Sequence, residues 1–250
     1  MKRQFFSFLA AWVFLTRIPL PPLDLDEKHF AQATAYYPLV GLLIGFIGAA
    51  GYAIGYLIEG PIIGALLAIA STVVATGAFH EDGLADLFDG LGAQTKERML
   101  EVMRDSRLGT FGAVSLMIVL ALKGATLASF EPYLALVALP LAHTVSRFSA
   151  VVVIATSSYS RAEGAAKPVA KGISRSALLI GAGTSIAALA TFAAVVSPVL
   201  AGLAVLGMAV GHGLTRFLFE RKLGGYTGDC LGAVQQVSEL GLYLAIAAWL

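Results

Sequence analysis

Six long apolar runs constrain what this chain can fold into more than any other feature of its sequence. A helix needs about 20 residues to cross the hydrocarbon core of a bilayer. Of the 250 residues, 58% are hydrophobic and only 13% are charged, whereas soluble domains have about 25% charged residues. We therefore predict an all-α, polytopic integral membrane protein. The runs cover residues 34–58, 61–79, 108–129, 132–155, 176–196 and 199–219.

Three short breaks join these runs in pairs. Pro61, Pro132 and Pro198 each stand where one run ends and the next begins. Because proline cannot continue a helix, these breaks predict tight helical hairpins. A further apolar stretch near 237–250 is shorter, so we expect six or seven transmembrane helices in one membrane-embedded domain, residues 1–250.

The N-terminal residues form a separate segment. Lys2 and Arg3 precede the apolar stretch 5–15, and the proline-containing sequence 16–22 ends it. This stretch is too short to span a bilayer but long enough to lie in its interface. We predict a short interfacial or re-entrant segment that is retained in the protein.

Basic residues predict the orientation. They concentrate in 1–33, 80–107, 156–175 and 216–236, and the three breaks contain none. Lysine and arginine are enriched in cytoplasmic loops. We therefore expect loops at about 80–107, 156–175 and 220–236 to face the cytoplasm, and to be where water-soluble substrates are handled.

Two basic residues lie inside the runs. Lys123 is near the outer end of the third run, so we expect it to reach the interface. Arg147 lies deeper, with His143 one helical turn away. It either extends to the interface or binds phosphate in a cavity that opens to the cytoplasm.

Composition also excludes some classes of protein. The net charge of +1 argues against a polyanion-binding surface, so nucleic acid is not an expected partner. Cys230 is the only cysteine, which excludes an intramolecular disulfide framework and a cysteine-rich zinc site.

Four carboxylates gather where the second run ends: Glu81, Asp82, Asp86 and Asp89. If that helix continues, the three aspartates stand at i, i+4 and i+7 and share one face. Like charges so arranged repel one another, and oxygen ligands favour Mg²⁺ or Mn²⁺. The neighbouring His80 is open to three readings: metal ligand, hydrogen-bond partner of a substrate, or interface anchor.

A second acidic series follows at Glu97, Glu101 and Asp105. Arg104 and Arg107 lie beside it and could meet phosphate oxygens. The alternative for this segment is a solvated helix face with ordinary salt bridges, which we favour for Glu97 and Glu101.

A third cluster lies in the sequence 221–233. Glycines surround Tyr226, Thr227 and Asp229 just before the last apolar stretch. Glycines with a hydroxyl and a carboxylate suit phosphate or metal contact. The segment is neither a Walker loop nor a dinucleotide-binding fingerprint.

Five motifs in order make the chain resemble the cobalamin synthase family, the adenosylcobinamide-GDP ribazoletransferases. They cover nearly the whole chain: FLTRIPLP (14–21), YYPLVGLLIG (36–45), TGAFHEDGLADLFDG (76–90), MRDSRLGTFGA (103–113) and GGYTGDCLGA (224–233). The resemblance implies an enzyme of the inner membrane that requires Mg²⁺. It would join adenosylcobinamide-GDP to α-ribazole, or to its 5′-phosphate, releasing GMP and completing adenosylcobalamin or its 5′-phosphate.

The resemblance and the charge pattern together give a set of expected site residues. Those expected to bind metal are Asp82, Asp86, Asp89 and Asp105. Those expected to act in catalysis are Asp82, Asp89 and Glu81, with Asp89 or Glu81 accepting a proton. Those expected to bind substrate are His80, Arg104, Arg107, Arg147, Thr227 and Asp229. Partners beyond the substrates and the bilayer would be a second copy of the chain or other enzymes of cobalamin assembly.

Two other functions stay open on the sequence alone. The segment 86–93 resembles the start of the motif of CDP-alcohol phosphotransferases, which make phospholipids, but Gln94 stands where that motif has arginine. A small-solute transporter is the other alternative. Its substrate would bind near the midplane, whereas these carboxylates lie at the end of a run.

Overall fold

The computed structural model describes residues 2–161 and 173–250, and both ranges are built of helices. Their only extended pairing is an isolated bridge between Tyr159 and Tyr226. The middle of the predicted 156–175 loop lies outside the described residues. In chain order the helices are α1 (Lys2–Leu15), α2 (Glu27–Ala33), the short 3₁₀ helix η1 (Thr34–Tyr36), α3 (Tyr37–Glu59), α4 (Pro61–Thr76), α5 (Phe79–Leu91), α6 (Lys96–Val102), α7 (Thr110–Ser129), α8 (Pro132–Thr156), α9 (Arg175–Val195), α10 (Pro198–Leu223) and α11 (Gly228–Ala247).

Six helical segments in these ranges are long and apolar enough to cross a membrane. They are the continuous stretch Glu27–Glu59, which ends in α3, and the helices α7, α8, α9, α10 and α11. The bent pair α4 and α5 makes a seventh if it is one span. The predicted all-α, multi-pass membrane fold with six or seven spans is confirmed.

The last span differs from its prediction. It begins at Gly228, nine residues before the apolar stretch that we expected from position 237. Gln235, Gln236 and Glu239 lower the hydropathy of this helix, but all three are buried inside the bundle. Polar residues that pair within a bundle are compatible with a spanning helix.

The second predicted run does not continue into the acidic motif. α4 ends at Thr76, and Gly77 and Ala78 both have left-handed backbone angles, with φ of 65° and 56°. α5 then leaves at 90° to α4. Glycine takes this conformation at little cost, and it ends the helix. The aspartates therefore lie on α5 itself, a separate helix that still keeps their i, i+4, i+7 spacing.

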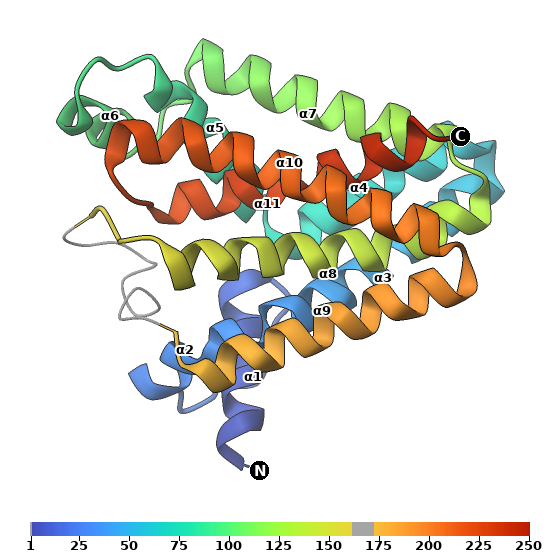
Figure 1. The fold of residues 1–250 in the computed structure, drawn as a ribbon, viewed down its shortest axis with the longest axis horizontal. Helices are drawn as coiled ribbons and strands as arrows, with labels where there is room; N and C mark the ends of the chain where they lie inside the picture. The colour runs from blue at the N-terminus through green and yellow to red at the C-terminus, as the bar shows by residue number, and fades with distance from the viewer. Residues whose placement is uncertain (1, 162–172) are drawn as a thin grey trace.

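The two ends of the bundle differ in character (Figure 1). One end carries the three proline turns and the C-terminus, and the other carries α5, α6 and the loop between α10 and α11. The predicted turns at Pro61, Pro132 and Pro198 are confirmed as helix starts. α3 and α4 pack closely as a hairpin, but α7 and α8 diverge because α11 packs against both.

The N-terminal helix α1 has 14 residues and is not among the candidate spans. Its Ala10 and Ala11 are fully buried against the bundle, whereas Phe5 is exposed. This length agrees with a segment that does not cross the bilayer, and its interfacial or re-entrant placement stays a prediction.

Candidate active site

A cavity of about 110 Å³ lies among α1, α3, α5, α8 and α11. One part of its lining is charged or polar and is formed by His80, Asp82, Arg147, Tyr159, Arg161, Asp229 and Gln235. The apolar part includes Phe14, Leu15, Tyr37 and Phe79. The structure thus brings four of the five sequence motifs and the C-terminal half of α8 to one place.

Two glycines let α5 and α11 approach closely enough to form this cavity. A Cβ on Gly83 would lie 2.9 Å from the carbonyl oxygen of Asp229, and one on Gly232 would lie 3.0 Å from that of His80. Larger residues would push the helices apart. The close crossing is what places Asp82 and Asp229, far apart in the sequence, on the same cavity.

Two aspartates and two arginines line the cavity: Asp82, Asp229, Arg147 and Arg161. Asp229 forms an ion pair with Arg161, with 2.8 Å between the charged atoms, and accepts a hydrogen bond from Thr227. Thr227 also caps the N-terminus of α11 through Cys230 N–H. Asp86 lies near enough to interact with Asp82, Asp89, Asp229 and Arg161. Several carboxylates therefore face one another at this end of α5.

This donor set suits a hard divalent cation, although it does not form a closed metal cage. Within residues 2–161 and 173–250, no three His, Cys, Asp or Glu side chains are placed to hold a metal ion by themselves. Mg²⁺ is usually held by one or two carboxylates, with water and substrate phosphates as its other ligands. Two aspartates at a cavity that also offers arginines to a phosphate fit that arrangement.

Arg147 lines the same cavity from α8 and is buried inside the bundle. Its side chain is 2% exposed, and one guanidinium nitrogen (Nη1) donates to the backbone oxygen of His143 at 3.0 Å. The same nitrogen lies 3.1 Å from Nδ1 of His143. Because arginine has no acceptor, that ring nitrogen must accept. The Nε atom of Arg147 is buried and has no partner in the described chain, so it can still donate to an anion.

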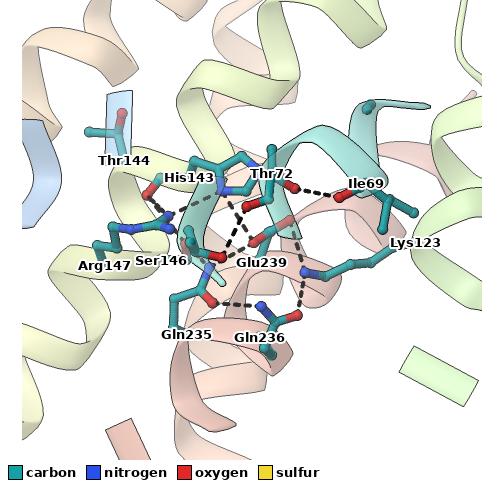
Figure 2. Close-up of polar contacts among 12 residues, drawn as sticks. Ile69, Thr72, Lys123, His143, Thr144, Ser146, Arg147, Gln235, Gln236 and Glu239 are labelled. Atoms are coloured by element: carbon teal, nitrogen blue, oxygen red, sulfur yellow. Dashed lines mark hydrogen bonds and ion pairs between the residues drawn. The ribbon is translucent and has the colours of Figure 1, made fainter. Parts of the chain in front are cut away.

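Behind Arg147 lies a buried group of polar side chains, which we call the interior network (Figure 2). It comprises Glu81, Lys123, His143, Gln235, Gln236 and Glu239. Lys123 is paired with Glu239 at 2.9 Å and donates to Gln236 at 2.6 Å. The expectation that Lys123 reaches the interface is wrong, because this buried carboxylate holds it inside, where the side chain is 4% exposed.

Glu81 belongs to the interior network and not to the cavity. It accepts a hydrogen bond from Gln236 at 2.8 Å, and it does not line the cavity as its neighbours His80 and Asp82 do. Successive residues on a helix point about 100° apart, since a turn has about 3.6 residues. The structure therefore separates Glu81 from the aspartates with which it was grouped.

Asp89 is engaged at another helix. Its two carboxylate oxygens accept hydrogen bonds from the backbone N–H groups of Gly109 and Gly112, each at 2.7 Å. It thus satisfies free N–H groups at the start of α7. This placement favours a structural role over the predicted catalytic and metal-binding roles.

Asp105, Arg104 and Arg107 also lie away from the cavity lining. Asp105 and Arg107 form an ion pair at 2.5 Å on the surface, and Arg104 is exposed. Hydrogen bonds from Arg107 lower the pKa of Asp105 to about 2. Asp105 and Arg107 line a second pocket with Asp89, apart from Asp82, and the metal and phosphate roles of these residues stay predictions.

Comparison with known proteins identifies the family. Residues 7–247 match the family described as cobalamin-5-phosphate synthase. The chain belongs to this family. It is 40% identical to an adenosylcobinamide-GDP ribazoletransferase of Ralstonia pickettii (strain 12J), with 96% of both chains covered. It is 41% identical to one of Shewanella sp. (strain ANA-3), with 96% of this chain and 92% of the relative covered. No solved structure matches the chain.

The family membership confirms the resemblance read from the five motifs, and with it the assignment to an enzyme of cobalamin biosynthesis, an adenosylcobinamide-GDP ribazoletransferase. The sequence had pointed to His80, Asp82, Arg147 and Asp229, and these four do line one cavity. It had not pointed to Arg161, which carries no signal beyond a place in a basic loop.

Glu239 was also missed, although the sequence held a signal for it. An acidic residue preceded by Gln235 and Gln236, just before an apolar stretch, indicates a buried polar group that needs a partner. Lys123 on α7 is that partner.

Proposed function

We propose that this member of the cobalamin-5-phosphate synthase family carries out the ribazoletransferase reaction in the cavity. It would join adenosylcobinamide-GDP to α-ribazole, or to its 5′-phosphate, and release GMP. One observation beyond the family match carries the site: aspartates and the incompletely paired Arg147 face the same cavity. That is the arrangement a cation-bound diphosphate needs.

Asp82, Asp86 and Asp229 are the residues that would hold Mg²⁺. When bound there, the ion would offset charge on the diphosphate and on the departing GMP. Asp229 takes the place of Asp89 and Asp105 of the sequence-based metal set, because Asp229 lines the cavity with Asp82 and those two residues do not.

The remaining polar side chains would bind phosphate and move a proton. Arg147 and Arg161 would donate hydrogen bonds to phosphate oxygens. A ribose hydroxyl of α-ribazole attacks the phosphorus on the cobinamide side, in line with the departing GMP. His80 lines the cavity and would accept the proton of that hydroxyl. Burial raises the pKa of Tyr159, which keeps its hydroxyl a donor.

We further propose that the cavity end of the bundle faces the cytoplasm of a cell inner membrane. The described basic segments around α5, α6 and the loop between α10 and α11 gather at that end (Figure 1). The positive-inside rule supports this orientation. Self-association, and association with other enzymes of cobalamin assembly, stay predictions.

The test is GMP release by purified protein supplied with adenosylcobinamide-GDP and α-ribazole, in Mg²⁺ and in excess chelator. We expect GMP only when both substrates and Mg²⁺ are present. Consumption of CDP-diacylglycerol instead would support the phospholipid alternative. Solute accumulation in proteoliposomes without turnover would support a transporter.

A further inference from the structure

The apolar end of the cavity is a continuous aromatic wall that the reaction at the carboxylates does not use. Tyr37 stacks on Phe14, with ring centroids 5.9 Å apart and planes 7° apart. Phe14 meets Phe79 edge-on at 5.3 Å, and Phe79 meets His80 edge-on at 5.5 Å. The wall therefore runs from an apolar region to the proposed proton acceptor.

The hydroxyl group of Tyr37 is a polar part of this wall that lacks a hydrogen-bond partner in the described residues. The residue is 4% exposed, and its hydroxyl is buried with no hydrogen-bond partner in residues 2–161 and 173–250. A buried hydroxyl without a partner costs free energy, and one that lines a cavity is free to donate a hydrogen bond to a ligand there. The ligand that fits is a flat, apolar ring with an acceptor atom.

We infer that this wall is the subsite for the heterocyclic base of the ribazole, and that Tyr37 determines its specificity by donating a hydrogen bond to the unsubstituted ring nitrogen. The benzimidazole of α-ribazole is flat, largely apolar and carries one such acceptor. With the base at Tyr37 and Phe14, the ribose extends toward His80 and the carboxylates, where its hydroxyl reacts. This inference rests on the proposed function, because it assigns the second substrate of that reaction.

The same helix provides a matched control. Tyr52, also on α3, is fully buried, and its hydroxyl has no partner among the residues that the structure describes, but it stacks on Tyr56 and does not line the cavity. Each Tyr→Phe substitution removes one buried hydroxyl group from α3. Only Tyr37 should affect the recognition of the base.

The experiment compares wild type, Tyr37→Phe and Tyr52→Phe with two nucleosides: α-ribazole and an indole riboside, in which a C–H group replaces the acceptor nitrogen. Equilibrium binding of each is measured by calorimetry on purified protein without the corrinoid, and KM for each substrate is measured by GMP release. We expect wild type and Tyr52→Phe to bind α-ribazole about fivefold more tightly than the indole analogue, the size of one neutral hydrogen bond. Tyr37→Phe should bind both equally, with KM for adenosylcobinamide-GDP unchanged.

Wild-type protein that does not discriminate between the two nucleosides would overturn the inference without any variant. So would Tyr37→Phe that still discriminates, or that raises KM for adenosylcobinamide-GDP as much as for α-ribazole. Failure of the proposed function looks different: wild type would bind α-ribazole with discrimination yet release no GMP.

Discussion

The cavity and the interior network share helices α5, α8 and α11 and differ in how their charges are matched. In the network, Lys123 pairs with Glu239, and glutamine side chains link that pair to Glu81, one oxygen of which has no hydrogen-bond partner in the described residues. At the cavity, Asp229 pairs with Arg161 but also lies near Asp82 and Asp86, so like charges face one another. Removing one partner of a buried ion pair destabilises the fold, whereas like charges gathered at a cavity suit a cationic ligand.

The two regions meet within one turn of α5, at Arg147 of α8 and at Gln235 of α11. His80 and Asp82 line the cavity, while Glu81 between them enters the network. Arg147 lines the cavity and is held by His143 of the network. Neighbouring residues should therefore have different effects when they are substituted. A substitution at the cavity should lower catalytic activity, and one in the interior network should lower stability.

The largest effect is expected at the cavity from Asp86→Asn. Loss of this charge should lower kcat by at least about 10³-fold, since metal-ion stabilisation is worth several kcal/mol. Membrane insertion should be unchanged and the melting temperature should be no lower than that of the wild type, because the substitution relieves repulsion between carboxylates. GMP release and thermal unfolding in detergent check both points, with Glu97→Gln as a control that should be nearly silent.

The corresponding change in the interior network is Glu239→Ala. It leaves Lys123 buried without its anion, which should cost about 3–5 kcal/mol of unfolding free energy. The double variant Lys123→Met/Glu239→Met should recover most of that loss, because apolar residues often replace a buried ion pair without cost. If the double variant is no more stable than the single one, the network is not held by this charge pair.

Arg147→Gln tests the residue that the two regions share. It should raise KM for adenosylcobinamide-GDP by about 10–100-fold, the value of a charge-assisted hydrogen bond to phosphate. KM for α-ribazole should change little. Arg216→Gln is the control, because Arg216 pairs with Glu220 and contacts Thr156 without lining the cavity. Equal effects from the two variants would remove Arg147 from the substrate site.

Asp89→Asn distinguishes the structural reading of this aspartate from a metal ligand. The amide keeps one acceptor of two, so the start of α7 should lose about 1 kcal/mol of stability. The Mg²⁺ concentration needed for half-maximal activity should stay that of the wild type. A tenfold rise in that concentration would show instead that Asp89 binds the metal ion.

The smallest effect is expected from Asp105→Asn. Arg107 lowers the pKa of Asp105 to about 2, so the ion pair is fully formed above the ordinary pKa of aspartate, about 4. The pair is lost only as the pH falls toward 2. Between pH 5 and 8 the variant and wild type should therefore show the same pH dependence of stability and of GMP release.

Much of the fold could be predicted from the sequence, because bilayer thickness and proline chemistry act locally. The turns at Pro61, Pro132 and Pro198 follow from single residues. The helix break at Gly77 and Ala78 could not be predicted, because the apolar run continues across it and glycine also occurs within these helices. The start of α11 was placed too late because its polar residues are matched only by distant partners.

The candidate site could be predicted only in part, for a related reason. The sequence grouped Glu81 with Asp82 and Asp86, and only the structure shows that Glu81 faces Gln236 and not the cavity. The engagement of Asp89 by Gly109 and Gly112 is a contact between distant segments, and no local pattern marks it. The same holds for Arg161, whose pairing with Asp229 depends on how the loop after α8 meets α11.

The most direct test of this account measures kcat and thermal unfolding side by side for two variants of adjacent residues, Asp82→Asn and Glu81→Gln. Asp82→Asn should abolish GMP release at saturating Mg²⁺ while its unfolding midpoint stays at or above that of the wild type. Glu81→Gln should lower the midpoint and keep most of the activity of the folded protein. An active Asp82→Asn variant, or a fully stable but inactive Glu81→Gln variant, would contradict the division between the cavity and the interior network.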